Sequence, residues 1–120
     1  MAVAIKDIRN AMNDPSLFIE RCYIDGAWVE ADDKKTLEVT DPATAETLGS
    51  VPSMTEVETR RAIDAAAAAL PAWRAKTAKE RSVILRKWFD LITEAKDDLA
   101  YLMTREQGKP LKAARNEVQY

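Results

Sequence analysis

The chain has 120 residues, of which 47% are hydrophobic and 32% are charged, and its formal net charge is −2. These values are typical of a globular domain with a modest core, and the balance of charge offers no basic surface to nucleic acid or to an anionic membrane. Histidine is absent, which excludes catalytic triads built on imidazole and the common zinc sites. The three glycines lie too far apart for a GxGxxG motif or a P-loop, so we expect no dinucleotide site of the usual kind.

The first residues and the single cysteine bear on the compartment. Residues 1–7 lack a basic stretch followed by a long apolar core, so we expect no secretory signal. No apolar run approaches the roughly 18 to 20 residues that span a bilayer. One cysteine, Cys22, cannot form an intramolecular disulfide, which fits a reducing compartment. The sequence therefore predicts a cytoplasmic protein.

The N-terminal third of the chain predicts an arm and short strands. Residues 1–16 are expected to form the arm, with a short helix whose apolar side is Val3, Ile5, Ile8 and Met12 and which ends near Asp14. Residues 21–30 predict a β-hairpin, because Asp25-Gly26 suits a type I′ turn whose two central residues need positive φ. Further strands are expected at residues 36–40 and 46–51, the second ended by Pro52.

The remaining residues have the spacing of helices. Thr55 and Glu58 form a capping-box pattern that opens a helix, which we expect Pro71 to end. A second capping box at residues 77–80 opens a longer helix that runs to residue 107, and Gly108 suits its left-handed terminator. A last helix follows Pro110 and carries Leu111, Ala114 and Val118 on one side. It has no stop signal before Tyr120, so we expect the chain to end inside an element.

The residue types that could carry chemistry have simpler structural explanations. Cys22 lies in a predicted strand without a base beside it, which favours a half-buried structural cysteine over a nucleophile. The Glu106–Pro110 run favours a corner between helices over a phosphate site, because the glycine pattern of a P-loop is missing. Adjacent acids, Asp32-Asp33 and Asp97-Asp98, are expected to be solvent groups. The basic residues Arg60-Arg61 and 79–81 could suggest an anion site, but solvated helix faces with i,i+4 pairing are the simpler explanation.

Six segments, in this order along the chain, resemble the start of the aldehyde dehydrogenase superfamily. The resemblance covers about residues 17–120, and its most distinctive part is the run from Glu106 to Leu111. The longer run 103–111, together with the lead-in 14–18, is most similar to the NAD(P)-dependent succinate-semialdehyde dehydrogenases. The six segments are residues 23–29, 39–44, 67–74, 77–81, 84–88 and 106–111.

The resemblance implies an α/β fold, with this chain as the N-terminal part of a dinucleotide-binding domain. The parts expected are an arm (1–16), a β-hairpin with short strands (17–52), and three helices of an incomplete NAD(P)-binding domain (53–120). The helices at 77–107 and from 111 onward would then need a missing sheet as their partner. That sheet would come from the rest of the polypeptide, and the full-length protein is expected to form a homo-oligomer.

The resemblance also implies the oxidation of an aldehyde, most simply succinate semialdehyde, to its acid with NAD or NADP. In the family, a cysteine thiolate attacks the aldehyde, hydride passes to the nicotinamide, and a glutamate activates the water that releases the acid. These residues lie beyond position 120, and Cys22 does not match the nucleophile's motif. We therefore expect no catalytic and no cofactor-binding residue here, and a chain that is inactive alone and poorly soluble or self-associated.

The resemblance also implies a cation site, because some positions of this sequence match the family's cation-binding positions. Some members hold a structural monovalent cation with backbone carbonyls before the Asp-Pro turn and with a carboxylate before Gly-Lys-Pro. In this sequence those positions are Val39, Thr40 and Glu106. Two other interpretations of the chain stay open beside the fragment: a stand-alone helical interaction module without enzymatic activity, and a complete small enzyme that uses Cys22.

Overall fold

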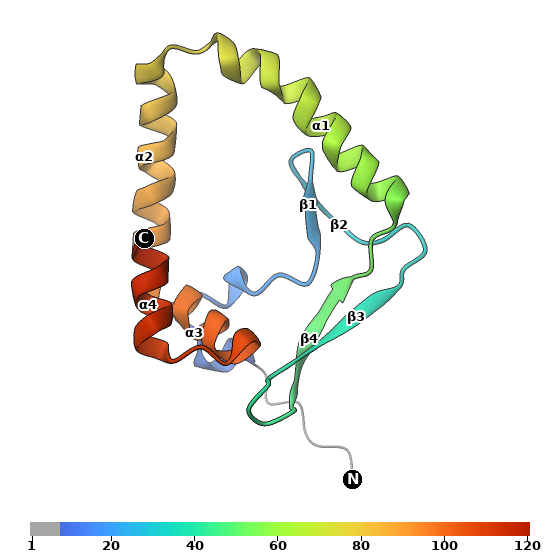
Figure 1. Ribbon diagram of the computed structural model, residues 1–120, viewed down its shortest axis with the longest axis vertical. Coiled ribbons are helices and arrows are strands. Elements are labelled where there is room, and N and C mark those ends of the chain that lie inside the picture. The colour runs from blue at the N-terminus through green and yellow to red at the C-terminus, as the bar shows by residue number, and fades with distance from the viewer. Residues whose placement is uncertain (1–7) are drawn as a thin grey trace. The chain divides into compact units, whose positions relative to one another are not determined.

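The computed structural model describes residues 8–120, and within them two pairs of strands precede four α-helices (Figure 1). The α/β character expected from the sequence is confirmed. None of the helices in this range is long and apolar enough to cross a membrane. The strands are β1 (Cys22–Ile24), β2 (Ala27–Val29), β3 (Thr36–Thr40) and β4 (Thr47–Pro52), and the helices are α1 (Glu56–Ala75), α2 (Ala78–Glu94), α3 (Lys96–Gln107) and α4 (Leu111–Gln119).

Two compact units interleave along the chain. One unit contains Glu38–Ser50 and Phe89–Tyr120 together with the arm up to Ile19, and we call it the corner unit. The other contains Glu20–Leu37 and Val51–Trp88, and we call it the hairpin unit. Each unit therefore joins segments that are far apart in the sequence.

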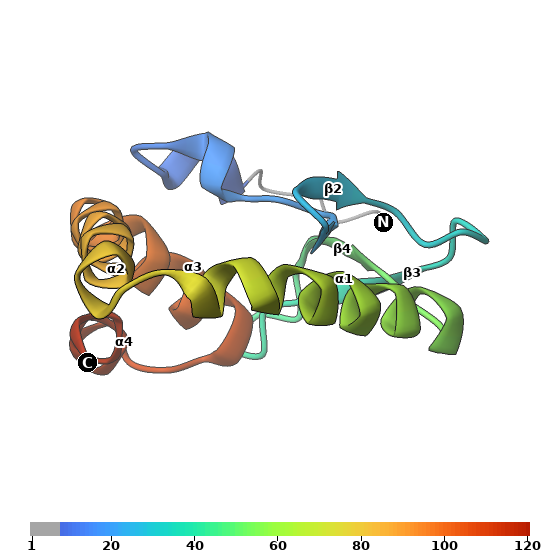
Figure 2. The ribbon, with the colours of Figure 1, turned by 90° about the horizontal axis from the view of Figure 1, so that it is seen from above.

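The predicted hairpin is confirmed. Asp25 and Gly26 both have positive φ, at 50° and 79°, as a type I′ turn requires. The register sets Cys22 opposite Val29 and Tyr23 opposite Trp28. The rings of Tyr23 and Trp28 meet edge to face, with their centroids 5.1 Å apart, on the exposed side of the hairpin. Strand β1 contacts α1, beside which it lies in Figure 2.

The second pair of strands extends one residue further than expected. Pro52 is the last residue of β4 and not the residue that stops it. A proline at a strand end removes only one donor from the ladder, and pairing resumes at once because Ser53 N–H donates to the Lys35 carbonyl at 2.9 Å.

Helix α1 begins as predicted and ends later than predicted. Thr55 and Glu58 form the capping box, but the helix passes through Pro71 and ends at Ala75. The proline removes one hydrogen bond, to the carbonyl of residue 67. Both Ala67 and Pro71 are exposed, so water can satisfy that carbonyl. The expectation that Pro71 ends the helix is therefore wrong.

The single helix expected from residue 77 to residue 107 is two helices, which raises the count from three to four. Residue Ala95 interrupts it, with φ −85° and ψ 6°. Helix α3 begins at Lys96, and the side chain of Asp98 in its first turn holds the N-terminal arm. The interruption coincides with a contact 84 to 85 residues away in sequence, which local periodicity does not reveal.

The arm contains two 3-10 helices, Ile8–Ala11 and Pro15–Leu17, in place of the single short helix expected. Val3 and Ile5 lie outside the described residues, whereas Ile8 and Met12 are buried as predicted. Asp14 starts the second 3-10 helix, and its carboxylate accepts the Ser16 N–H at 3.0 Å.

The core of the described residues is small. The hydrophobic side chains buried in it are Ile8, Met12, Ile24, Ala31, Leu48, Ala100 and Ala114. Many large apolar side chains of α1 and α2 are at least half exposed, among them Ile63, Leu70 and Trp88. Helices α3 and α4 pack against one another. Of the predicted apolar side of α4, Ala114 is fully buried and Val118 is half-buried, whereas Leu111 is exposed.

Candidate functional site

The turn after β3 places the first predicted cation-site residues. Asp41 follows Thr40 directly, and its carboxylate accepts the N–H groups of Ala43 at 2.8 Å and Thr44 at 3.3 Å. The Asp41 side chain is buried, and these backbone hydrogen bonds hold its pKa below the ordinary value, with Arg105 acting in the same direction. A local Asx-type turn thus fixes the chain just beyond Val39 and Thr40.

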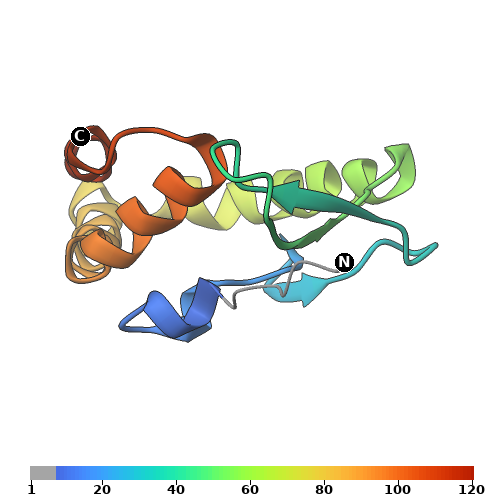
Figure 3. The same cartoon turned by 90° about the horizontal axis from the view of Figure 1, so that it is seen from below.

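Arg105 of α3 ties that turn to the helix. Its Nε donates to Asp41 at 2.7 Å, and a terminal nitrogen donates to Glu46 at 3.2 Å. The other terminal nitrogen donates to the Tyr101 hydroxyl at 3.2 Å. The Arg105 side chain is about one-fifth exposed, so little solvent competes for these bonds. Figure 3 shows the β3–β4 turn beside the C-terminal end of α3.

Gly108 completes this corner. It terminates α3 with φ 76° and ψ 11°, the left-handed cap predicted from the sequence. A Cβ at this position would lie 3.0 Å from Cγ of Pro42, so the glycine serves both the helix end and the close approach of the turn. The corner between β3 and α3 is therefore fixed by a buried ion pair and by a packing contact.

The structure brings Val39, Thr40 and the last turn of α3 into one corner but directs Glu106 to another face. Tyr101, Arg105 and Gly108 share the face that meets the turn, and Thr104 lies between them at helical spacing. Glu106 instead lines a hollow whose other residues are Ile92, Leu99, Leu102, Met103, Gln107, Glu117 and Val118.

Two side-chain oxygen donors in the last turn of α3, Thr104 and Glu106, have no partner in the described range, but they lie on different faces of the helix. The Oγ1 atom of Thr104 is buried and has no hydrogen-bond partner within residues 8–120. In the same range the Glu106 carboxylate has no ion pair, and burial raises its pKa. Oxygen donors without partners suit a hard cation, and backbone carbonyls would have to complete the set. No group of three or more His, Cys, Asp or Glu side chains in this range could hold a metal ion.

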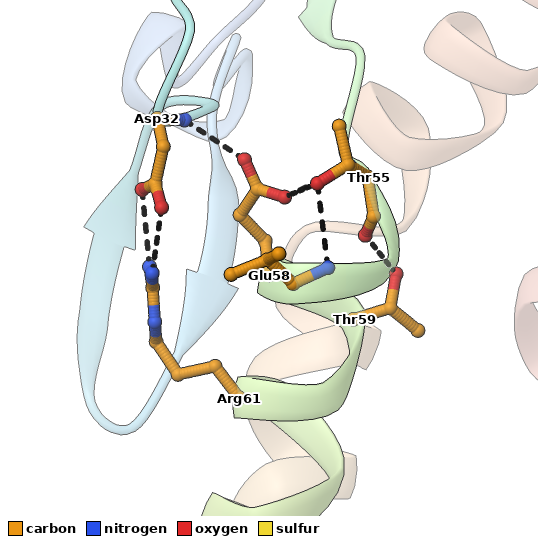
Figure 4. A network of polar contacts seen from close by, with 6 residues as sticks. Asp32, Thr55, Glu58, Thr59 and Arg61 are labelled. Carbon is orange, nitrogen blue, oxygen red and sulfur yellow. Dashed lines mark hydrogen bonds and ion pairs between the residues drawn. The ribbon is translucent and has the colours of Figure 1, made fainter.

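A second polar network, in the hairpin unit, was not anticipated beyond its capping box (Figure 4). Glu58 is only 1% exposed, and its carboxylate accepts the backbone N–H groups of Asp32 and Thr55, both at 2.9 Å, and the Thr55 hydroxyl. The Thr55 hydroxyl is the largest cause that lowers the pKa of Glu58, to about 2. Arg61 grips the Asp32 carboxylate with two nitrogens, at 3.2 and 2.7 Å.

Two acids that were expected to be solvent groups, Asp98 and Asp32, have hydrogen-bond partners in the structure. Asp98 is buried, and it accepts Asn13 N–H at 2.9 Å and Asp14 N–H at 2.7 Å, with a third bond from the Asn13 amide. These backbone bonds keep the pKa of Asp98 below its ordinary value. Asp32 is exposed but paired with Arg61. The expectation of a solvent group is therefore wrong for Asp98, whose partners lie 84 and 85 residues away, and is confirmed for Asp32, which is exposed although paired.

The other candidates are in the positions expected of structural residues. Cys22 is a half-buried free thiol in β1. Arg60 pairs with Glu56 one turn away at 2.6 Å, the i,i+4 partner predicted, and both side chains are exposed. Lys109, in the Gly-Lys-Pro run, pairs with Glu117 of α4, so its charge is used inside the corner unit.

Comparison with known proteins adds a family. The profile of the Aldehyde dehydrogenase family matches residues 28–120. Among curated relatives, the chain is 60% identical over 109 residues to the glutarate-semialdehyde dehydrogenase of Pseudomonas aeruginosa. It is 56% identical over 109 residues to the NADP-dependent succinate-semialdehyde dehydrogenase GabD of Escherichia coli. Each alignment covers 91% of this chain but only 23% of the relative, so the chain spans about a quarter of their length.

Solved structures agree with this similarity. A crystal structure of an NADP-dependent enzyme of E. coli matches with a TM-score of 0.89 at 56% identity, over 91% of this chain and 23% of that one. A succinate-semialdehyde dehydrogenase of Burkholderia pseudomallei matches with the same TM-score and identity, over 92% and 23%. A betaine aldehyde dehydrogenase of Staphylococcus aureus, solved with NAD+, matches at 35% identity with a TM-score of 0.78 over 82% and 21%.

Proposed function

The chain belongs to the aldehyde dehydrogenase family, and from this premise we propose that it is the N-terminal part of an NAD(P)-dependent semialdehyde dehydrogenase. The full-length protein oxidises an aldehyde that carries a carboxylate at its other end, with succinate semialdehyde as the first choice and glutarate semialdehyde as the second. The observation that carries the proposal is the identity of 56 to 60% to relatives with these two activities.

The described residues themselves support a structural role in that enzyme. They contain neither a cysteine beside a base nor a glycine-rich phosphate loop, so nucleophile and cofactor site would come from the rest of the polypeptide. The exposed side chains of α1 and α2, such as Ile63, Ile84 and Trp88, would pack against that remainder. Segments 1–16, 17–52 and 53–120 are then its arm, its hairpin with strands, and the helical layer of its NAD(P)-binding domain.

The same proposal includes the compartment, the oligomeric state and the cofactor of the full-length enzyme. A single cysteine that is free in the structure suits the reducing cytoplasm. The full-length enzyme would be a homo-oligomer whose partners are the small aldehyde and NAD or NADP. The choice between the two cofactors belongs to residues outside this chain, because a structure solved with NADP and one solved with NAD+ each match more than four fifths of it.

The structural part of the proposal is tested with a chimera, in which residues 1–120 replace the matching part of the E. coli succinate-semialdehyde dehydrogenase, whose remaining residues supply the nucleophile and the cofactor site. We expect the chimera to reduce NADP in the presence of succinate semialdehyde, followed by the absorbance of the reduced nicotinamide. The 120-residue chain alone, at equal concentration, should give no turnover and no saturable heat on titration with NAD or NADP. Turnover by the chain alone, or a folded but inactive chimera, would contradict the proposal.

We also propose that Val39 and Thr40, through their carbonyls, and Glu106, through its carboxylate, hold a structural monovalent cation in the full-length enzyme. The support is the fixed corner after β3 and the carboxylate of Glu106, which has no partner among residues 8–120. Because that side chain lines the hollow beside α4, the site requires it to turn toward the corner in the full-length enzyme. Thermal inactivation of the chimera should be slower in potassium or sodium chloride than in choline chloride at equal ionic strength. Glu106→Gln should reduce that difference, whereas Glu56→Gln, an exposed control, should preserve it. Equal stability in all three salts would refute the site.

A further inference from the structure

The hollow where α1 passes into α2 holds a cation without a partner. It is lined by Trp73, Ala78, Arg81, Ser82, Leu85 and Arg86, and we call it the Arg81 hollow. Trp73 lies in the last turn of α1, and Arg81 lies in the first turn of α2. Both side chains are half-buried, so the expectation of a solvated, paired arginine at position 81 is wrong. Residues 81, 82, 85 and 86 share one side of α2 because three or four residues make one helical turn.

Arg81 differs from the other arginines of the described range. Apart from the exposed Arg74, each of the others has a carboxylate, an aromatic ring or another contact beside it. Arg81 has no hydrogen bond or ion pair within residues 8–120. The acid next to it in sequence, Glu80, is engaged in the capping box, where it accepts Thr77 N–H at 2.7 Å and the Thr77 hydroxyl at 2.8 Å.

The chemistry of the hollow specifies what can cover it. A guanidinium does not lose its proton in proteins, so covering Arg81 further without an acceptor would leave an unpaired buried charge. A charged acceptor forms a shorter and stronger hydrogen bond with a guanidinium than a neutral carbonyl does, which favours a carboxylate as the partner of Arg81. Trp73 and Leu85 supply apolar surface beside the charge, which an aliphatic or aromatic neighbour of the acceptor would cover.

We infer that the Arg81 hollow receives an aspartate or glutamate side chain from the part of the enzyme that corresponds to the remaining three quarters of its relatives. The inference rests on the proposed function, because it takes this chain, which spans 23% of those relatives, to be one part of a longer enzyme. The carboxylate pairs with Arg81 while its flanking residues pack on Trp73 and Leu85. The contact fastens the α1–α2 turn to the rest of the enzyme and takes no part in the chemistry of the aldehyde.

The test compares Arg81→Gln with Arg74→Gln in the chimera defined above. Arg74 is the matched control, because it is also an arginine without a partner among residues 8–120 but is exposed on α1. We expect Arg81→Gln to lower the temperature of half-inactivation by about 2–6 °C, as one lost buried pair would in a large enzyme, and Arg74→Gln to change it by less than about 1 °C. Arg81→Lys should recover part of the loss, and kcat and KM should stay those of the parent.

The pH identifies the acceptor. A carboxylate whose pKa is depressed by Arg81 contributes stability above its unfolded pKa of about 4 and loses it as the pH falls through the lower folded value. The difference in the temperature of half-inactivation between the parent and Arg81→Gln should therefore be largest near pH 7 and should shrink below about pH 4.

Three results separate the alternatives. A difference that appears only when inorganic phosphate is added would mean a free anion in place of a side chain, and would overturn the inference. If the chimera is active and Arg81→Gln is as stable as the parent, the inference is overturned and the proposed function stands. A chimera that does not fold would count against both.

Discussion

The corner unit and the hairpin unit treat their charged groups in different ways. In the corner unit, buried Asp41 and Asp98 are each held by groups from distant segments, and Arg105 bridges two elements. In the hairpin unit, Glu58 is satisfied as fully, but Arg81 has no partner among the described residues and large apolar side chains of α1 and α2 are exposed. The corner is closed by contacts within this chain, whereas the face along α1 and α2 is suited to a surface supplied from elsewhere.

The largest effect should come from the exposed face. In the 120-residue chain, Ile84→Lys with Trp88→Lys should reduce self-association, because these side chains lie one helical turn apart and are 46% and 62% exposed. The same pair of substitutions in the chimera should abolish soluble, active enzyme. Light scattering during size-exclusion chromatography and the NADP assay measure the two outcomes. An active double variant would mean that this face is not buried in the enzyme.

Arg105→Met should have the next largest effect, because it leaves the buried Asp41 carboxylate without its cation. We expect the temperature of half-inactivation of the chimera to fall by about 5–10 °C, and Arg105→Lys to recover only part of it, since lysine cannot engage Asp41 and Glu46 with a planar fork. Arg74→Met is the control, because Arg74 is exposed and has no partner among residues 8–120. A loss no larger than that control would show that the turn and the helix are held by packing alone.

Asp98→Asn tests how the corner unit holds the arm. The amide keeps one acceptor oxygen but loses the charge and the second acceptor, so one of the N–H groups of Asn13 and Asp14 becomes unsatisfied. We expect faster hydrogen exchange at residues 13 and 14 and a fall of a few degrees in thermal stability. Asp97→Asn, which touches only exposed Arg115, should leave exchange at the arm unchanged. Equal exchange in the two variants would mean that Asp98 does not hold the arm.

The lowered pKa of Glu58 predicts that thermal stability depends on pH in the acid range. Its folded pKa, about 2, lies below the ordinary 4.5, so its contribution is full above pH 4.5 and is lost as the pH falls toward 2. Thermal midpoints of the chimera followed downward from neutral pH should therefore fall less in Glu58→Gln than in the parent. Parallel curves for the two proteins would contradict the carboxylate's role as acceptor.

The smallest effect should come from the exposed pair Glu56–Arg60. Both side chains are largely in solvent, at 83% and 70% exposure, so Arg60→Ala should change stability by less than about 0.5 kcal/mol. Denaturant midpoints of parent and variant chimeras measure this. A larger loss would mean that Arg60 acquires a further partner in the complete enzyme.

The sequence by itself determined the features whose partners lie within a few residues. The Asp25-Gly26 turn, the capping box of Thr55 and Glu58, and the left-handed Gly108 follow from backbone sterics and from hydrogen bonds that span at most one helical turn. The resemblance of six short segments likewise led to the correct family, because those segments keep their order along the chain.

Only the tertiary structure decided the features that depend on distant groups. The interruption at Ala95 coincides with the grip of Asp98 on the arm, and the pairing of Asp41 with Arg105 spans 64 residues. Helix α1 continues past Pro71 to Ala75, although an interior proline removes a hydrogen bond and crowds the carbonyl four residues before it, so local sequence rules did not fix this helix end. Charge type and spacing show which residues can pair, but the free energy of a pair depends on burial, which the fold alone sets.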